Sequence, residues 1–225
     1  MTILVLAPHP DDEILGVGGT MARLCAEDHK VVVAVVTGFG VDPHPFLKAE
    51  DVVTAREECK RANGLIGVSE VLFADLPAVS LDSTPVWQTN KVVQEIIEEV
   101  NPDQLYLPFP LDLHKDHAAV AYGAYVAARP YLSLGRQIKR VLFYETLTET
   151  HLSPPYLDAG FQPNLFVDIS DHLDAKLAAM REYKSQIQGN DLPRSEKGLT
   201  VLANFRGMHV GVEAAEAFII SRELI

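Results

Sequence analysis

Short apolar runs alternate with helix-like segments through most of the chain, and this alternation constrains the fold more than any other feature of the sequence. The runs Ile3–Ala7 and Val31–Val36 are continuously apolar, which is typical of parallel strands that are buried on both faces. Further strands are predicted over residues 71–74, 104–107, 141–144 and 166–169. Helical spacing and helix-ending residues predict helices over residues 13–26, 48–63, 86–100, 118–128, 174–188 and 212–221.

Alternating strands and helices predict an α/β fold, because each helix must cover the sheet formed by the strands on either side of it. Right-handed crossovers then favour a Rossmann-like, doubly wound, mainly parallel sheet with helices on both faces. The 225 residues fit one domain, and neither a repeat nor a change in composition divides them. Residues 1–225 are therefore expected to form a single α/β domain.

The charge and the apolar content exclude several classes of partner. A formal net charge of −12 argues against nucleic acid and against an anionic membrane surface, since both are bound through Lys and Arg. The N-terminal apolar run lacks a basic leader, and no apolar stretch has transmembrane length. Cys25 and Cys59 lack metal-ligand spacing and are interpreted as reduced thiols. These features predict a cytoplasmic protein without a membrane partner.

Two polar clusters follow predicted strands. The cluster His9–Asp12 comes directly after the first strand, and the cluster His114–His117 comes shortly after the fourth. In open α/β sheets, ligands bind beyond the carboxyl ends of the strands, where the winding reverses. If the third, second, first and fourth strands lie side by side in that order, the two clusters face each other at this edge of the sheet.

Imidazole and carboxylate groups in two facing clusters are suitable ligands for a catalytic zinc or a similar divalent ion. Such a site needs about three protein ligands and leaves a position for water, and His9, Asp12 and one histidine of the second cluster supply that set. Asp11 is adjacent to Asp12, so one carboxylate can bind metal while the other stays free as a base. A single aspartate here would more often be only a helix N-cap. Glu13 is interpreted as a first-turn acid that supports the helix.

Other kinds of site fit the sequence less well. The glycines at residues 16, 18 and 19 lack the dinucleotide spacing, because Met21 occupies the third glycine position. The chain has no Gly-x-Ser-x-Gly elbow, which disfavours a serine hydrolase. Four further polar residues have no assigned role at this point: His44, Glu145, His151 and His209.

The two clusters resemble the motifs of a known family. Pro8–Glu13 is similar to the (P/A)HPDDE segment of the PIG-L/LmbE-like de-N-acetylases, and His114–His117 is similar to their HxDH segment. Arg56-Glu57-Glu58 resembles the Arg-Glu segment of the family's second helix, while Arg206-Gly207 and Ala215–Phe218 resemble its C-terminal signature. The chain is therefore identified as a member of this family, with matches spread over nearly its whole length.

The resemblance implies a metal-dependent hydrolase, usually with zinc, that removes an acetyl group from N-acetylglucosamine-type sugars joined to a larger group. Asp11 would be the general base. His114 would stabilise the oxyanion and protonate the leaving amine, and Asp116 would orient His114 and keep it protonated nearer neutral pH. Arg56 would hold the substrate, often through a sugar hydroxyl. Three residues would bind the metal: His9, Asp12 and His117.

The resemblance leaves some questions open. Phe39 stands where many relatives carry an acid, so the sugar contacts of that loop are not carried over. One rival hypothesis is an amidase that uses the same site on a thiol conjugate, a peptide or an antibiotic-like amide. Another is a metal-binding module without catalysis. The expected partner is a small amino-sugar-type substrate, and relatives often form homo-oligomers, a state that this sequence does not decide.

Overall fold

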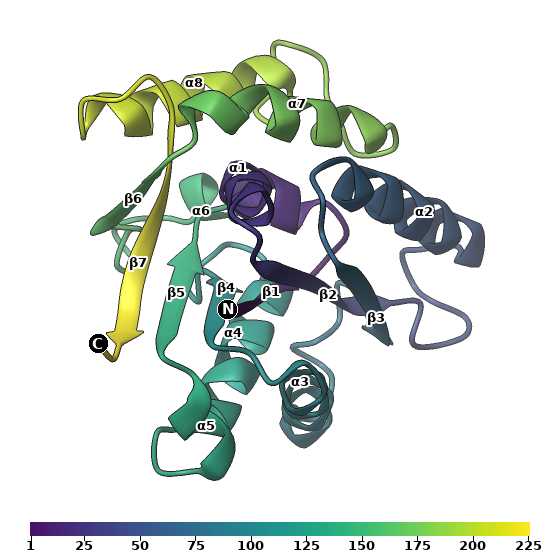
Figure 1. The fold of residues 1–225 in the computed structure, drawn as a ribbon. Helices are drawn as coiled ribbons and strands as arrows, with labels where there is room; N and C mark the ends of the chain where they lie inside the picture. The colour runs from purple at the N-terminus through teal and green to yellow at the C-terminus, as the bar shows by residue number, and fades with distance from the viewer.

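The computed structural model describes residues 1–225, which form a seven-stranded sheet flanked by helices (Figure 1). The strands are β1 Thr2–Ala7, β2 Lys30–Gly38, β3 Glu70–Pro77, β4 Gln104–Pro108, β5 Arg140–Tyr144, β6 Leu165–Asp168 and β7 Ala215–Glu223. Their order in the sheet is β3-β2-β1-β4-β5-β7-β6. Strands β1 to β5 are parallel, whereas β7 runs antiparallel to both of its neighbours. The predicted α/β fold with a mainly parallel sheet is confirmed.

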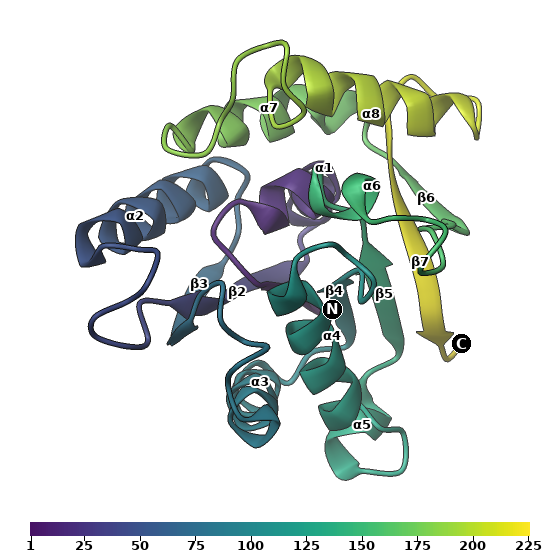
Figure 2. The same ribbon diagram turned by 180° about the vertical axis from the view of Figure 1, so that it is seen from behind.

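Helices cover both faces of the sheet (Figures 1 and 2). They are α1 Asp12–Ala26, α2 Ala49–Leu65, α3 Val86–Val100, α4 Lys115–Ala127, α5 Ser133–Gln137, α6 Glu149–Leu152, α7 Leu173–Glu182 and α8 Glu196–Met208. One face is covered by α1, α2 and α7, and the other by α3 and α4. Helix α8 packs against α7 and β7. None of the helices combines the length and apolar character that crossing a membrane requires.

The apolar run of β2 supplies both hydrophobic cores. The odd-numbered side chains of Val31–Val36 pack with α1, α2 and α7, and the even-numbered ones pack with α3 and α4. All six side chains are completely buried. Because successive side chains of a strand point to opposite faces, a continuous apolar run is what a central, doubly covered strand requires.

The winding of the sheet reverses at β1, which pairs with β2 on one side and with β4 on the other. The chain passes outward through β2 and β3, returns to β4 and then continues outward through β5. The predicted order of the first four strands is therefore confirmed. Because β1 and β4 are parallel neighbours, the segments that follow Ala7 and Pro108 leave the sheet at the same edge.

The C-terminal segment differs from the prediction. We predict a helix over residues 212–221, but Ala215–Glu223 forms β7, which lies between β5 and β6. Alanine and glutamate favour a helix locally. In the folded chain, both edges of the segment form backbone hydrogen bonds with a neighbouring strand, and Phe218 is completely buried in the core. Tertiary packing therefore overrides the local preference.

The helices before this segment also differ from the prediction. The helix predicted over residues 174–188 ends at Glu182, and the segment 183–195 that follows has no regular structure. Helix α8 is absent from the prediction, although Ser195 is a good N-cap for it and accepts the backbone N–H of Gly198 at 3.1 Å.

Glycines of α1 allow close packing of this helix on the sheet. A Cβ atom at Gly16 would lie 2.3 Å from Tyr144 Cδ2, and one at Gly19 would lie 2.6 Å from Ile169 Cδ1. Such contacts are far inside van der Waals distance, so a larger residue would displace the helix. The glycines are thus required by packing in the helix interior.

A buried ion pair connects α1, α7 and β7. Lys176 Nζ donates to Glu216 at 2.6 Å and to the carbonyl oxygen of Leu15 at 2.8 Å. Glu216 also accepts the backbone N–H groups of Gly19 and Thr20, at 2.9 and 2.7 Å. Each charged side chain is only 4% exposed. Lys176 and Glu216 therefore neutralise each other's buried charge, and the backbone groups of α1 satisfy their remaining hydrogen bonds.

Lys176→Met is expected to lower the free energy of unfolding by about 3–5 kcal/mol, because it leaves the Glu216 carboxylate buried without a counter-charge. Urea unfolding followed by circular dichroism measures this loss. Arg181→Met is the matched control, since it breaks the exposed ion pair with Glu196 and is expected to cost at most about 1 kcal/mol. Equal losses in the two variants would contradict the prediction.

Candidate active site

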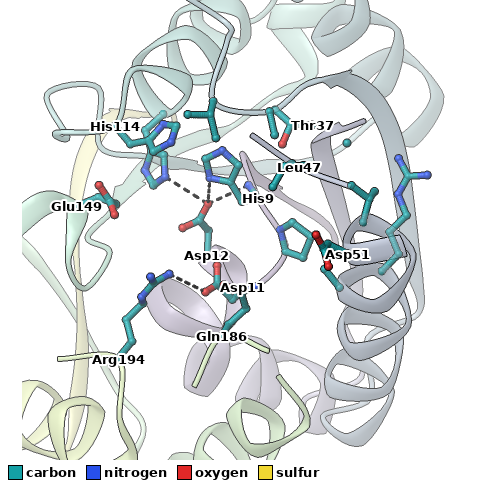
Figure 3. Close-up of a pocket in the computed structure, with 18 of the residues that line it drawn as sticks. His9, Asp11, Asp12, Thr37, Leu47, Asp51, His114, Glu149, Gln186 and Arg194 are labelled. Carbon is teal, nitrogen blue, oxygen red and sulfur yellow. Dashed lines mark hydrogen bonds and ion pairs between the residues drawn. The ribbon is translucent and has the colours of Figure 1, made fainter. Parts of the chain in front are cut away.

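A cavity of about 310 Å³ opens at the edge of the sheet where β1 and β4 end (Figure 3). Other parts of its wall come from the end of β2, from α2 and from the segment between α7 and α8. Six of the seven predicted site residues line the cavity: His9, Asp11, Asp12, Arg56, His114 and His117. The seventh, Asp116, lies outside the lining and contacts the ring of His9.

Three of these side chains converge closely enough to share one ion. Asp12 Oδ2 lies 3.4 Å from His9 Nδ1 and 3.3 Å from His117 Nε2, and the three ligand atoms lie within 4.8 Å of one another. His117 Nε2 is buried and has no hydrogen-bond partner. Its one polar neighbour is the Asp12 carboxylate at ion-pair distance, and a cation shared by the three side chains would give this buried nitrogen a direct partner. Two imidazoles and one carboxylate form a donor set that suits zinc, and the residues therefore fit a divalent metal ion.

Each of the two histidines has a carboxylate on its other ring nitrogen. His117 Nδ1 lies 2.8 Å from Asp112 Oδ2, and His9 Nε2 lies 2.9 Å from Asp116 Oδ2. Carboxylates in this position fix the orientation and tautomer of a metal-binding imidazole. No motif in the sequence singles out Asp112. Its place in the loop after β4, five residues before His117, is the signal that would have identified it.

Asp112→Asn is expected to weaken zinc binding by about 10–100-fold, because the amide holds the His117 ring less firmly and makes it a poorer ligand. Competition for zinc with a chromogenic chelator measures the change. Asp103→Asn is the matched control, since Asp103 binds the backbone N–H of Thr2 at the opposite end of the sheet. An unchanged zinc affinity in Asp112→Asn would show that Asp112 does not support zinc binding.

The side chain of Asp116 makes different contacts from those predicted. Its carboxylate accepts the backbone N–H groups of Val79 and Leu81, at 2.6 and 3.0 Å, in addition to its contact with His9. Only its backbone N–H reaches His114, donating to Nδ1 at 3.2 Å. The predicted pairing of the Asp116 carboxylate with His114 is not formed, because the first turn of α4 directs the carboxylate toward His9. His9, His114 and Asp116 form a second group whose possible ligand atoms lie close together. Within that group, the Asp116 carboxylate is already engaged by the contacts described above.

The carboxylates around the two histidines favour positive charge. Burial lowers the pKa of His9, but hydrogen bonds with Asp116 and Asp12 outweigh burial and raise this pKa to about 9. Burial likewise lowers the pKa of His117, and the charges of Asp12 and Asp112 outweigh it and raise this pKa to about 10. The surroundings that stabilise imidazolium would also stabilise a divalent cation between these side chains.

Asp11 and Asp12 point in different directions, as Figure 3 shows: Asp12 faces the histidines and Asp11 faces Arg194. Asp11 Oδ2 lies 3.3 Å from Arg194 Nη1. Burial and the neighbouring charge of Asp12 hold the pKa of Asp11 well above its ordinary value, although Arg194 acts in the opposite direction. One carboxylate therefore faces the candidate metal ligands, while the other is a separate acid–base group in the same cavity.

His114 is the N-cap residue of α4 and uses Nδ1 to accept the backbone N–H of Asp116. The neutral ring then carries its proton on Nε2. Burial, followed by the positive charge of His9, lowers the pKa of His114. The charge of Asp116 raises this pKa, as predicted, but burial and the charge of His9 outweigh it. A neutral imidazole N–H remains a good donor for an oxyanion.

The segment between α7 and α8 adds cavity residues that sequence analysis does not identify. Arg194 and Gln186 line the cavity from this segment, and Glu149 lines it from α6. Two hydrogen bonds join Gln188 and Arg194 within this segment. Gln188 donates its backbone N–H to the Arg194 carbonyl oxygen, and its Oε1 accepts the backbone N–H of Arg194. No short motif marks these residues, since they reach the site through the packing of α7 and α8.

Four polar residues without an assigned role lie outside the cavity wall. Glu145 binds Arg206 through two hydrogen bonds of 2.7 and 2.6 Å and lies 3.2 Å from His151. His209 stacks on Phe166, with ring centroids 5.9 Å apart. These three residues therefore hold the C-terminal elements together.

His44, the fourth of these residues, supports the cavity wall from behind. Its Nε2 contacts the carbonyl oxygen of Ala78 at 2.9 Å, and its Nδ1 accepts the backbone N–H groups of Phe46 and Leu47. Leu47 and Ala78 both line the cavity. His44 therefore joins two parts of the wall without contributing its own side chain to the lining.

Comparison with known proteins identifies the family. A family model described as PIG-L: GlcNAc-PI de-N-acetylase matches residues 4–128. This span covers more than half of the chain and contains both polar clusters. The chain belongs to the PIG-L family. The family predicted from the two motifs is thereby confirmed, and the converging side chains described above are those of a PIG-L protein.

Relatives of this PIG-L chain share most of its length. Diacetylchitobiose deacetylase of Thermococcus kodakarensis is 28% identical over 224 residues, which cover 95% of this chain and 80% of that protein. N,N'-diacetylchitobiose deacetylase from Pyrococcus horikoshii has a similar structure, with a TM-score of 0.77 and 24% identity over 98% of this chain and 84% of that one.

The same fold also occurs in a protein named for a different reaction. GalB, the 4-carboxy-2-hydroxymuconate hydratase from Pseudomonas putida KT2440, has a TM-score of 0.76 and 18% identity over 100% of this chain and 97% of that one. The fold alone therefore does not determine the reaction, which has to be argued from the family and from the site.

Proposed function

We propose that this PIG-L chain is a zinc-dependent deacetylase that hydrolyses the N-acetyl group of an N-acetylated amino sugar or its conjugate. The observation that carries the proposal is the convergence of His9, Asp12 and the buried Nε2 of His117, which makes no hydrogen bond, in the cavity that also holds the separate carboxylate of Asp11. A set of metal ligands alone would suit a binding module. A second carboxylate that is free to accept a proton supplies the base that hydrolysis needs.

The reaction consumes one amide and one water and yields acetate and a free amine. A zinc ion held by His9, Asp12 and His117 would supply Lewis acidity toward the amide carbonyl and the attacking water. Asp11 takes a proton from this water as its oxygen bonds to the carbonyl carbon. His114 donates a hydrogen bond from Nε2 to the oxyanion of the tetrahedral intermediate.

The leaving nitrogen must receive a proton before the carbon–nitrogen bond breaks. The lowered pKa of His114 and its N-cap contact favour the oxyanion role over the acid role for this residue. Asp11, which holds the proton of the attacking water, is then the donor that returns it to the amine. This assignment gives Asp11 both proton transfers and modifies the role first expected for His114.

Two arginines on separate walls of the cavity support a sugar-like substrate. Arg56 Nη2 donates to Ala74 and Asp75, at 2.7 and 2.9 Å, while its Nε is buried without a partner. The Nε of Arg194 is likewise buried without a partner. Both side chains line the cavity, and the several N–H donors of a guanidinium group fit the many acceptor oxygens of a sugar. The names of the family and of its relatives point to N-acetylglucosamine derivatives, and we extend this substrate class to the present chain.

Arg56→Ala is expected to raise KM for the sugar substrate by about tenfold or more, which is the effect of losing a charged hydrogen bond. The value of kcat is expected to change little, because Arg56 would bind ground state and transition state alike. Steady-state kinetics separate the two constants. Lys60→Ala, one turn further along α2, is the control, and a kcat defect without a change in KM would contradict a binding role for Arg56.

The proposed function is tested by incubating the zinc-loaded protein with N-acetylglucosamine, N,N'-diacetylchitobiose and an N-acetyl amino acid. The expected result is acetate and primary amine in equal amounts from at least one of the sugars, at a higher kcat/KM than from the amino acid. Release from the amino acid alone would replace the proposed substrate class. If none of the three substrates released acetate, the proposed deacetylase function would be overturned.

A further inference from the structure

The backbone of Asp11 adopts an unusual conformation directly before α1. Its φ is 113° and its ψ is −29°, in the left-handed region that residues with a side chain rarely adopt. Such a conformation persists only where the surrounding structure fixes it, and it is most common at functional sites. The groups that fix Asp11 therefore determine where its carboxylate lies.

Three contacts hold Asp11. Its carbonyl oxygen accepts the backbone N–H groups of Ile14 and Leu15, at 3.0 and 2.9 Å. Its carboxylate contacts Arg194 at 3.3 Å. Its own backbone N–H donates to Glu13 Oε2 at 3.1 Å. The first of these contacts is an ordinary feature of a helix start, whereas the contact with Glu13 comes from a side chain.

Glu13 is completely buried and bound on both oxygens. Its Oε1 accepts Asn63 Nδ2 at 2.8 Å and the hydroxyl of Tyr183, and Cys59 Sγ lies 3.7 Å away. Asn63 and Cys59 belong to α2, and Tyr183 follows α7 directly. A first-turn acid that only complements the helix dipole would lie in solvent. Glu13 instead connects the backbone of Asp11 to two other helical elements.

We propose that Glu13 is a positioning residue for the catalytic base: its Oε2 holds the Asp11 backbone in the left-handed conformation that directs the Asp11 carboxylate into the cavity. The inference rests on the proposed function, because it assumes that Asp11 is the base. The backbone N–H of Asp11 requires from residue 13 an acceptor oxygen within hydrogen-bond distance. The α2 and α7 contacts fix that oxygen in place.

Three substitutions separate this role from a purely structural one. Glu13→Gln keeps an oxygen at the same reach, and the unpartnered Oδ1 of Asn63 offers an acceptor for the new amide if the Asn63 side chain turns over. Glu13→Asp keeps the charge but is one methylene shorter, so it cannot contact both Asp11 and Asn63. Glu13→Met fills the space, removes the acceptor and leaves no buried charge, which favours folding.

We expect Glu13→Gln to retain kcat to within about threefold. Glu13→Asp and Glu13→Met are expected to lower kcat by about 10²-fold, as a displacement of roughly 1 Å at a reacting group does. Zinc content and KM are expected to stay at wild-type values in all three, because the three metal ligands and the cavity wall apart from Asp11 are unchanged. Wild-type kcat in the folded Asp or Met variant would overturn the proposal.

Glu216→Asp is the matched control. Glu216 is also a buried acid that binds backbone N–H groups of α1, at Gly19 and Thr20, away from Asp11. Its shortening is expected to reduce stability while leaving the kcat of the folded protein unchanged. An equal kcat loss in Glu216→Asp would mean that any disturbance of α1 reduces activity, and the specific role of Glu13 would be rejected.

Crystal structures of Glu13→Asp and Glu13→Met provide a readout that does not depend on activity. The proposal expects the φ of Asp11 to leave the left-handed region or its carboxylate to move out of the cavity. An unchanged Asp11 in both structures would overturn the proposal even if the deacetylase function stands. Absence of activity in the wild-type protein would reject the proposed function, and the position of Asp11 in these structures would still test what holds it.

Discussion

Asp11→Asn is expected to lower kcat by about 10²–10⁴-fold, the usual contribution of a general base. Asparagine has the same shape and can still accept a hydrogen bond from Arg194, but it cannot take a proton from the attacking water. The three proposed metal ligands are left intact, so the zinc content and KM are expected to stay close to those of the wild type. Kinetics and metal analysis of the same preparation test both parts.

Asp51→Asn is the control for this variant. Asp51 also lines the cavity, but its carboxylate accepts the backbone N–H of Lys48 at the start of α2, away from the candidate metal ligands. Its kcat is expected to remain within about threefold of wild type, as for surface changes outside the reacting groups. A zinc-loaded Asp11→Asn that turns over as fast as Asp51→Asn would show that the base is another group.

Removal of the metal is expected to abolish turnover, and Asp12→Asn is expected to have nearly the same effect. The Asp12 carboxylate lies between the two histidines and is the negative ligand of the proposed set. Without it, two imidazoles alone would bind zinc much more weakly, since catalytic sites use about three protein ligands. Dialysis against a chelator, followed by an assay with and without added Zn²⁺, measures the loss and the recovery.

The expected pattern has two parts. The chelated wild type regains activity with Zn²⁺, whereas Asp12→Asn shows little activity at zinc concentrations that saturate the wild type. His151→Asn is the control, because His151 also lies beside a carboxylate, that of Glu145, but outside the cavity. Full activity in a preparation shown to be free of metal would contradict any metal-dependent reaction at this site.

The sequence predicts the sheet well because its central strands are buried on both faces. A continuous apolar run such as Val31–Val36 has few alternatives to a central parallel strand. The right-handed crossovers then place the segments after β1 and β4 at one edge. The elements at the other side of the sheet are harder to predict. The β7 segment becomes a strand only because β5 and β6 pair with both of its edges, a condition that no local pattern reports.

The same distinction applies to the candidate site. His9, Asp11, Asp12 and His117 lie in compact motifs after strands, so their meeting follows from the strand order. The partners of these residues come from elsewhere or from side-chain direction. Arg194 reaches Asp11 from a segment 183 residues later in the chain. The direction of the Asp116 carboxylate depends on the loop that carries Val79, and spacing within a motif does not report it.

Diffraction from crystals of the zinc-loaded Asp11→Asn variant soaked with N,N'-diacetylchitobiose, recorded at the zinc absorption edge, tests the central claim most directly. The expected result is a single anomalous peak at about 2.0–2.2 Å from His9 Nδ1, an oxygen of Asp12 and His117 Nε2. An acetamide carbonyl of the sugar is expected to point at that peak. A peak held by other residues, or a sugar bound with both acetamide groups away from it, would contradict the account.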